Sequence, residues 1–152
     1  MSEREDLAIV PHQGVGPVRF GMAREDVQRE LGPPRGPEVR GGHCFWEGLF
    51  VHFDANGRVE FIELANNARF RALFDGVCLH EVPAEEAIRV VARHGSYDEN
   101  DPELGYTYVF PELQLSLWRP TRPEPGQAPD DIGGRYFAAV GIGAAGYFKW
   151  TR

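Results

Sequence analysis

A glycine-rich segment near the C-terminus is the first place where residue spacing suggests chemistry. Residues 141–146 read Gly-Ile-Gly-Ala-Ala-Gly and fit the G-x-G-x-x-G pattern of dinucleotide-binding sites. Such a site needs a helix directly after the glycines and an acidic residue about 20 positions further on. Only residues 147–152 follow here. The segment therefore predicts a glycine-rich strand end with a bulge or tight turn, and no nucleotide site.

Two cysteine and histidine pairs could act as nucleophiles or metal ligands. On a strand, Cys78 and His80 would share one face at a separation of roughly 6.5 Å, which is long for direct activation of a thiolate. We therefore expect a buried thiol and a hydrogen-bonded imidazole. His43 and Cys44 would complete a set of four ligands, but their spacing matches no standard zinc pattern. The sequence favours neither zinc nor any other cofactor.

Other catalytic signals are weak. The acidic run at residues 98–103 lacks the glycine and the terminal glutamate of an EF-hand loop, which favours a solvated acidic loop. Ser2, Ser96 and Ser116 are the serines, and none lies in a G-x-S-x-G motif. No catalytic residue is predicted, so a protein without enzymatic activity is favoured.

Composition sets the broad class of the protein. A chain of 152 residues with 42% hydrophobic residues can form one domain, residues 1–152, around a packed core. The net charge of −7 disfavours nucleic acid and anionic membranes as partners. The N-terminal segment contains no signal peptide and no lipidation cysteine, and the sequence contains no long apolar stretch. These features predict a cytoplasmic protein in which Cys44 and Cys78 are reduced thiols.

The chain also shows an internal similarity. Residues 16–31 align with residues 76–91 without a gap, with glycines and apolar residues at matching positions. Two short strands follow each of these segments. The alignment predicts two pseudo-repeats, at about residues 8–66 and 67–152, which share a single domain.

Local patterns predict the elements of each repeat. Apolar spacing and flanking Pro and Gly residues indicate helices at residues 23–31 and 83–94. Residues 49–54 and 113–118 alternate between apolar and other side chains, as strands with one buried face do. We expect an α+β fold of two tandem repeats, each a helix plus antiparallel strands. Together they would form one mostly antiparallel sheet with both helices on one face.

The first repeat resembles a known family. Gly21 and Met22 precede the first helix, Val27 lies within it, and Leu31 and Gly32 end it, with a hairpin of the type Phe-Asp-Ala-Asn-Gly-Arg-Val further on. This pattern resembles the helix-plus-antiparallel-strand modules of β-lactamase inhibitory proteins and of small outer-membrane assembly lipoproteins of the SmpA/OmlA type. The resemblance covers about residues 14–64. It implies a tandem-repeat sheet with a concave surface that binds another protein.

Strand alternation predicts which residues would form such a surface. If Leu113, Leu115 and Leu117 face the helices, the residues between them face away. The same reasoning applies to the strand at residues 49–54. Aromatic residues with an arginine at the rim are typical of protein-binding hot spots. The predicted partner-binding residues are Phe50, His52, Asp54, Gln114, Trp118 and Arg119.

The sequence thus favours a non-enzymatic protein-binding module of inhibitor or immunity type, with an unidentified protein partner. One alternative is a small-molecule-binding or catalytic domain with a pocket on the same face, where His52, Asp54 and Glu60 would supply acid and base groups. A further alternative is that this face forms a homodimer.

Overall fold

The computed structural model describes residues 4–39 and 41–148. Within them the chain forms two helices and a series of short strands. The helices are α1 (Arg24–Leu31) and α2 (Ala84–Ala92). The strands are β1 (Glu5–Val10), β2 (Gly14–Val15), β3 (Val18–Arg19), β4 (Gly42–Trp46), β5 (Leu49–Phe53), β6 (Val59–Ala65), β7 (Phe70–Phe74), β8 (Val77–Cys78), β9 (Thr107–Phe110), β10 (Leu115–Trp118) and β11 (Ala139–Gly143).

The strands form two separate sheets, which corrects the expected architecture. One sheet has five strands in the order β3-β2-β1-β7-β8, and the other has six in the order β4-β5-β6-β11-β10-β9. The prediction of one sheet with both helices on one face is therefore wrong. Its error lies in the strands that precede each helix. Strands β1, β2 and β3 before α1, and β7 and β8 before α2, form a sheet of their own instead of extending the antiparallel sheet. Within it, β1 and β7 pair in parallel.

Strand β1 was not among the elements predicted from the sequence. In this strand Leu7 and Ile9 are buried while Asp6 and Ala8 are exposed, which is the alternation of a half-buried strand. Acidic residues lie in and beside this strand, so the composition of the segment alone does not indicate a strand. Residues 5–8 of β1 pair with β7, and Ile9 and Val10 pair with β2, so that both neighbours supply backbone hydrogen bonds to β1.

The six-stranded sheet is antiparallel throughout, and its inner face supplies much of the core. The inward side chains of its central strands are at most 1% exposed: Leu49, Val51, Ile62, Leu64, Leu115, Leu117, Val140 and Ile142. The core cluster also includes side chains from the five-stranded sheet and from both helices. One apolar core therefore holds the two sheets together.

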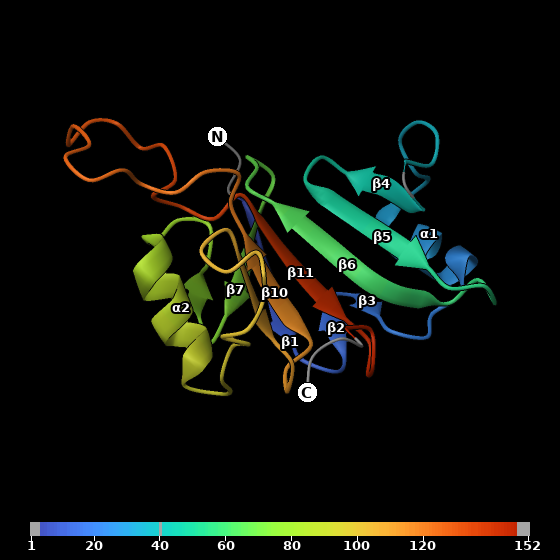
Figure 1. The fold of residues 1–152 in the computed structure, drawn as a ribbon. Coiled ribbons are helices and arrows are strands. Elements are labelled where there is room, and N and C mark those ends of the chain that lie inside the picture. Colours follow the sequence, from blue (N-terminus) through green and yellow to red (C-terminus); the bar gives the residue numbers. More distant parts are fainter. Residues whose placement is uncertain (1–3, 40, 149–152) are drawn as a thin grey trace.

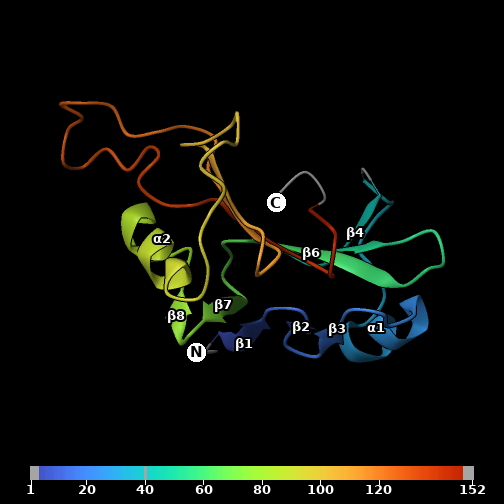
Figure 2. The same cartoon turned by 60° about the horizontal axis from the view of Figure 1, so that its bottom comes forward.

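Figures 1 and 2 show how the layers are arranged. In Figure 1 the six-stranded sheet lies towards the viewer, and no helix crosses it. In Figure 2 the five-stranded sheet lies below it, with α1 near the β3 end and α2 near the β8 end. Among the described residues, neither helix has the length and apolar character needed to cross a membrane.

The two helices lie close to their predicted positions. In α1, Val27 and Leu31 are buried, and Gly32 ends the helix with a φ of 87° that favours glycine. Helix α2 begins directly after Pro83, and acidic residues lie in its first turn, where the helix dipole favours them. It ends at Ala92, two residues before the predicted end.

The order of elements is similar in the two halves of the chain. In each half, short strands precede one helix, and three strands of the six-stranded sheet follow it. The three strands of the first half occupy one side of that sheet, and those of the second half occupy the other. The pseudo-repeats at residues 8–66 and 67–152 remain a prediction, which a superposition of the two halves would test.

The two end residues of β10 should respond differently to truncation. Leu115 is fully buried, whereas Trp118 is 43% exposed. We expect Leu115→Ala to lower the free energy of unfolding by about 2 to 5 kcal/mol, because it leaves a cavity in the core. Trp118→Ala should lower it much less. Urea denaturation of both variants measures the difference, and equal losses would mean that Trp118 contributes to the core as Leu115 does.

Candidate functional site

The strongest candidate site is the side of the six-stranded sheet that faces away from the core. Strand pairing places Phe50 of β5, Glu63 of β6, Gly141 of β11 and Ser116 of β10 in one transverse row. We call this side the outer face, and its outward residues on the central strands are Phe50, His52, Phe61, Glu63, Ala65, Ala139, Gly141, Gly143, Ser116 and Trp118.

Three of the six predicted partner-binding residues lie on the outer face. Phe50 and His52 are half-buried residues of β5, and Trp118 is the exposed residue at the end of β10. Strands β6 and β11 separate β5 from β10, so the two groups are about 14 Å apart across the sheet. One standard protein interface could cover both groups.

The other three predicted residues have structural roles. Gln114 is 7% exposed, and its amide donates to the carbonyl of Pro111 and accepts from the backbone N–H of Phe148. Arg119 is 8% exposed and donates to the carbonyls of Gly105 and Gly134, both at 2.8 Å.

Asp54, the third of these residues, lies in the turn between β5 and β6. One of its carboxylate oxygens accepts the backbone N–H groups of Asn56 and Arg58. This carboxylate is engaged in the hairpin turn, and it does not form an acid and base pair with His52. The structure therefore does not bring Asp54, Gln114 and Arg119 together with Phe50, His52 and Trp118.

The end of the described chain folds back over part of the outer face. The ring of Tyr147 stacks on Phe61 with ring centroids 4.5 Å apart, and Phe148 contacts the same ring edge-on. Glu60 and residues 144–147 surround a shallow hollow of about 300 Å³ beside this stack. Tyr147 and Phe148 therefore cover part of the outer face.

This arrangement explains the glycine motif at residues 141–146. A Cβ atom at Gly141 would lie 2.5 Å from the Phe61 ring, and one at Gly143 would lie 2.6 Å from the Cβ of Tyr147. Gly146 has a φ of 79°, a turn conformation that favours glycine. The first two glycines make room for aromatic rings and the third permits the turn. As the sequence predicted, the segment forms a strand end followed by a turn.

Two acidic side chains influence the titrating groups of the outer face. Burial lowers the pKa of His52, and the nearby carboxylates of Glu63 and Glu60 partly oppose this effect. Burial raises the pKa of Tyr147, and the same two carboxylates raise it further. His52 is therefore neutral at pH 7, and its ring packs edge-on against Phe61 with centroids 5.3 Å apart.

Three members of this face were not predicted from the sequence: Phe61, Glu63 and Tyr147. Phe61 and Glu63 alternate with the buried Ile62 and Leu64, and this pattern of period two was a usable signal. Nothing local indicates Tyr147, because its place depends on how the chain turns back after β11.

The cysteine and histidine pair does not form a nucleophilic site. The ring of His80 is buried, and its Nε2 lies 3.0 Å from the carbonyl oxygen of Leu64. Burial raises the pKa of Cys78, which keeps its thiol protonated. Both Cys44 and Cys78 are free. Across residues 4–39 and 41–148, no three His, Cys, Asp or Glu side chains gather in a way that could hold a metal ion.

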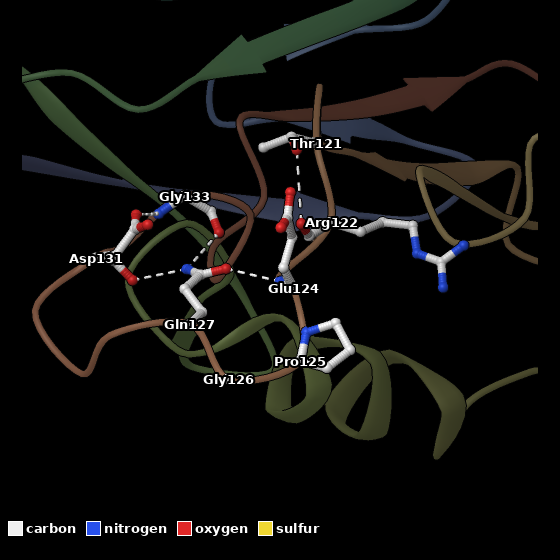
Figure 3. Close-up of a pocket in the computed structure, with 8 residues that line it drawn as sticks. All are labelled: Thr121, Arg122, Glu124, Pro125, Gly126, Gln127, Asp131 and Gly133. Carbon is white, nitrogen blue, oxygen red and sulfur yellow. Dashed lines mark hydrogen bonds between the residues drawn. The ribbon is translucent and has the colours of Figure 1, made fainter.

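A second hollow, of about 280 Å³, lies within the long loop that follows β10 (Figure 3). The side-chain amide of Gln127 closes this loop. It donates to the carbonyls of Asp131 and Gly133 and accepts the backbone N–H of Glu124. Figure 3 shows the Arg122 side chain pointing away from these groups. The polar groups of Gln127 are thus used to hold the loop together, which makes the hollow a weaker candidate than the outer face.

Comparisons with known proteins identify no family and no relative for this chain. A scan against protein-family models, a search of curated proteins and a search of solved structures each found no match. The resemblance to β-lactamase inhibitory proteins and SmpA/OmlA-type lipoproteins stays a prediction from residues 14–64.

The packing of rings against glycines leads to a first test of this site. We expect Gly143→Ala to lower the free energy of unfolding by about 1 to 3 kcal/mol, because the new methyl group overlaps Tyr147. Gly133→Ala is a matched control, since Gly133 is exposed and lacks a positive φ. A Cβ at Gly133 would lie 3.2 Å from a carboxylate oxygen of Asp131, an exposed side chain that can move, so this variant should change the free energy of unfolding by less than about 1 kcal/mol. Urea denaturation measures both, and an unchanged value for Gly143→Ala would contradict the described position of Tyr147.

The buried histidines lead to a test of pH dependence. Burial lowers the pKa values of both His52 and His80 in the folded state, so the unfolded chain binds more protons just below its own histidine pKa of about 6.5. The contribution of these two histidines to the free energy of unfolding is most favourable above about pH 6.5. It is lost as the pH falls towards the pKa values that the two groups have in the folded state. We therefore expect the urea midpoint to fall between pH 7.5 and pH 5.5.

His52→Gln and His80→Gln should each reduce this fall. His12→Gln, at an exposed position, serves as the control. Equal pH dependence in all four proteins would show that the two buried histidines do not cause the effect.

Proposed function

We propose that this protein is a non-enzymatic binding module of inhibitor or immunity type, which uses the outer face of its six-stranded sheet to hold another protein. The observation that carries this proposal is the exposed Trp118 on a sheet face that also presents Phe50 and the ring of Tyr147, which stacks on Phe61. Neither α1 nor α2 lies across this face (Figure 1). Tryptophan is among the residues most enriched at the energetic centres of protein interfaces.

The composition of the face supports a protein partner more than a small molecule. A small-molecule site is usually a deep, mostly apolar cavity in which a few polar groups converge. The hollow beside Tyr147 is shallow, and the Asp54 carboxylate is bound to its own turn. A broad surface with separated aromatic side chains is better suited to the standard interface of about 800 Å² per partner.

Small side chains in the middle of the face also favour this proposal. Ala139, Gly141 and Gly143 of β11 lie between the side chains of β6 and those of β10. Rings from Phe61 and Tyr147 occupy the space above two of them, whereas Trp118 stands directly beside Ala139 in the register. Trp118 is 43% exposed at this position, so a partner can reach its indole.

The test begins with the capture of proteins from the native organism on immobilised wild-type protein. A captured protein is then purified, and its binding is measured by calorimetry against two variants. We expect Trp118→Ala to weaken binding by about 2 kcal/mol or more, which is roughly a thirtyfold increase in Kd.

Ile132→Ala is the matched control, because Ile132 is also an exposed apolar residue, at 68%, but lies in the long loop outside the sheet. It should change the Kd by less than about twofold. Loss of binding in the Ile132 variant without loss in the Trp118 variant would move the interface away from the outer face and contradict the proposal.

A further inference from the structure

Glu63 is an unusual residue on the outer face. It lies on β6, one of the two central strands of the sheet, directly opposite Phe50 on one side and Gly141 on the other. Its side chain makes no hydrogen bond and no ion pair with any residue in the described part of the chain. Since no buried polar atom of the described side chains lacks a partner, the Glu63 carboxylate remains in contact with solvent.

Aromatic groups surround this carboxylate. Phe50 is its cross-strand neighbour, at a Cβ separation of about 5 Å, and Phe61 is the next outward residue on its own strand. Tyr147 stacks on Phe61, and the charges of Glu63 and Glu60 both affect its hydroxyl. Phe50 and Tyr147 are both partly exposed, whereas Phe61 lies between Tyr147 and the backbone of Gly141. Negative charge beside partly exposed aromatic rings is a combination that attracts a cationic side chain.

No positive charge of the sheet itself neutralises this region. The outward positions of the described strands β4, β5, β6, β11, β10 and β9 contain neither Lys nor Arg. The whole chain carries a net charge of −7. A two-fold dimer built on the centre of this face would bring the Glu63 side chains of two copies towards each other, at an electrostatic cost. The same charge disfavours nucleic acid.

We propose that the outer face binds a positively charged protein surface, and that a Lys or Arg side chain of this partner lies against Phe50, beside the stack of Tyr147 on Phe61, with its charge on Glu63. This inference rests on the proposed function and names the chemistry of the partner. The aromatic rings would cover the aliphatic part of the incoming side chain and contribute a cation–π interaction. Partial removal of water would strengthen the contact between the two charges.

The experiment uses a random twelve-residue peptide library displayed on phage as the probe. Peptides are selected on the wild-type protein and then screened against the double variant Phe50→Ala/Trp118→Ala. Those that lose binding define ligands of the outer face. Several of them are synthesised, and their Kd values are measured by fluorescence anisotropy for the wild type, Glu63→Gln and Glu30→Gln. Glu30 is the matched control, because it is an exposed glutamate on α1, outside this sheet.

We expect the face-binding peptides to share a Lys or Arg. Glu63→Gln should raise their Kd about tenfold, as should replacement of that basic residue by Gln, and the two changes together should add little further loss. Glu30→Gln should change the Kd by less than about twofold. Raising the salt concentration from 50 to 500 mM should weaken wild-type binding more than binding to Glu63→Gln.

Other outcomes separate this inference from the function on which it rests. Face-binding peptides that lack a basic residue, or that bind Glu63→Gln and wild type equally, overturn the inference and leave the binding function standing. A library that yields no ligand of the outer face counts against both. A wild-type dimer in sedimentation that Trp118→Ala separates overturns the inference in favour of a second copy as the occupant.

Discussion

The antiparallel pairing of β6 with β11 is the interaction on which the rest of the structure depends. It joins the last strand of the first half to the last strand of the second half, from Phe61 opposite Gly143 to Ala65 opposite Ala139. Its inward residues, Ile62 and Leu64 with Val140 and Ile142, have no exposed surface and hold the centre of the core. A shift of one residue would exchange the two faces of β11 and place glycines in the core. The register of this pair therefore determines both the stability of the fold and the composition of the outer face.

The outer face results from a match between small and large side chains across this pair. Gly141 and Gly143 provide the space that the Phe61 and Tyr147 rings occupy, so the end of the described chain is held against the sheet. The backbone N–H of Phe148 bonds to the amide oxygen of Gln114 at 2.7 Å. Gln114 has a φ of 52°, which is uncommon for a residue other than glycine, and its hydrogen bonds offset the cost of that conformation. Part of the face is thus covered by the chain itself, while Trp118 stays exposed.

Several side chains of a functional type are used to build the structure. Arg119, Gln127 and Asp54 all hold backbone groups of loops and turns, which the long segments between the strands cannot satisfy through a ladder. Glu63 differs from these, because its carboxylate lies on a regular strand and has no partner among the described residues. A charge held in this way contributes nothing visible to the fold. The inference about the charge of the partner is therefore based on Glu63. Arg119, in contrast, does not support a binding role.

The sequence by itself determined the local elements of this protein. The helices at residues 23–31 and 83–94 correspond to α1 and α2, because apolar spacing, Pro83 and Gly32 act within a few residues. The alternation of Leu115 and Leu117 with Trp118 separated buried from exposed side chains for the same reason. Only the tertiary structure decided that β1 pairs with β7, that the strands divide into two sheets, and that Gln114 and Arg119 turn inward. These outcomes depend on hydrogen bonds between segments far apart in the chain. The residue pattern of a single segment does not indicate which distant segment will form hydrogen bonds with its backbone.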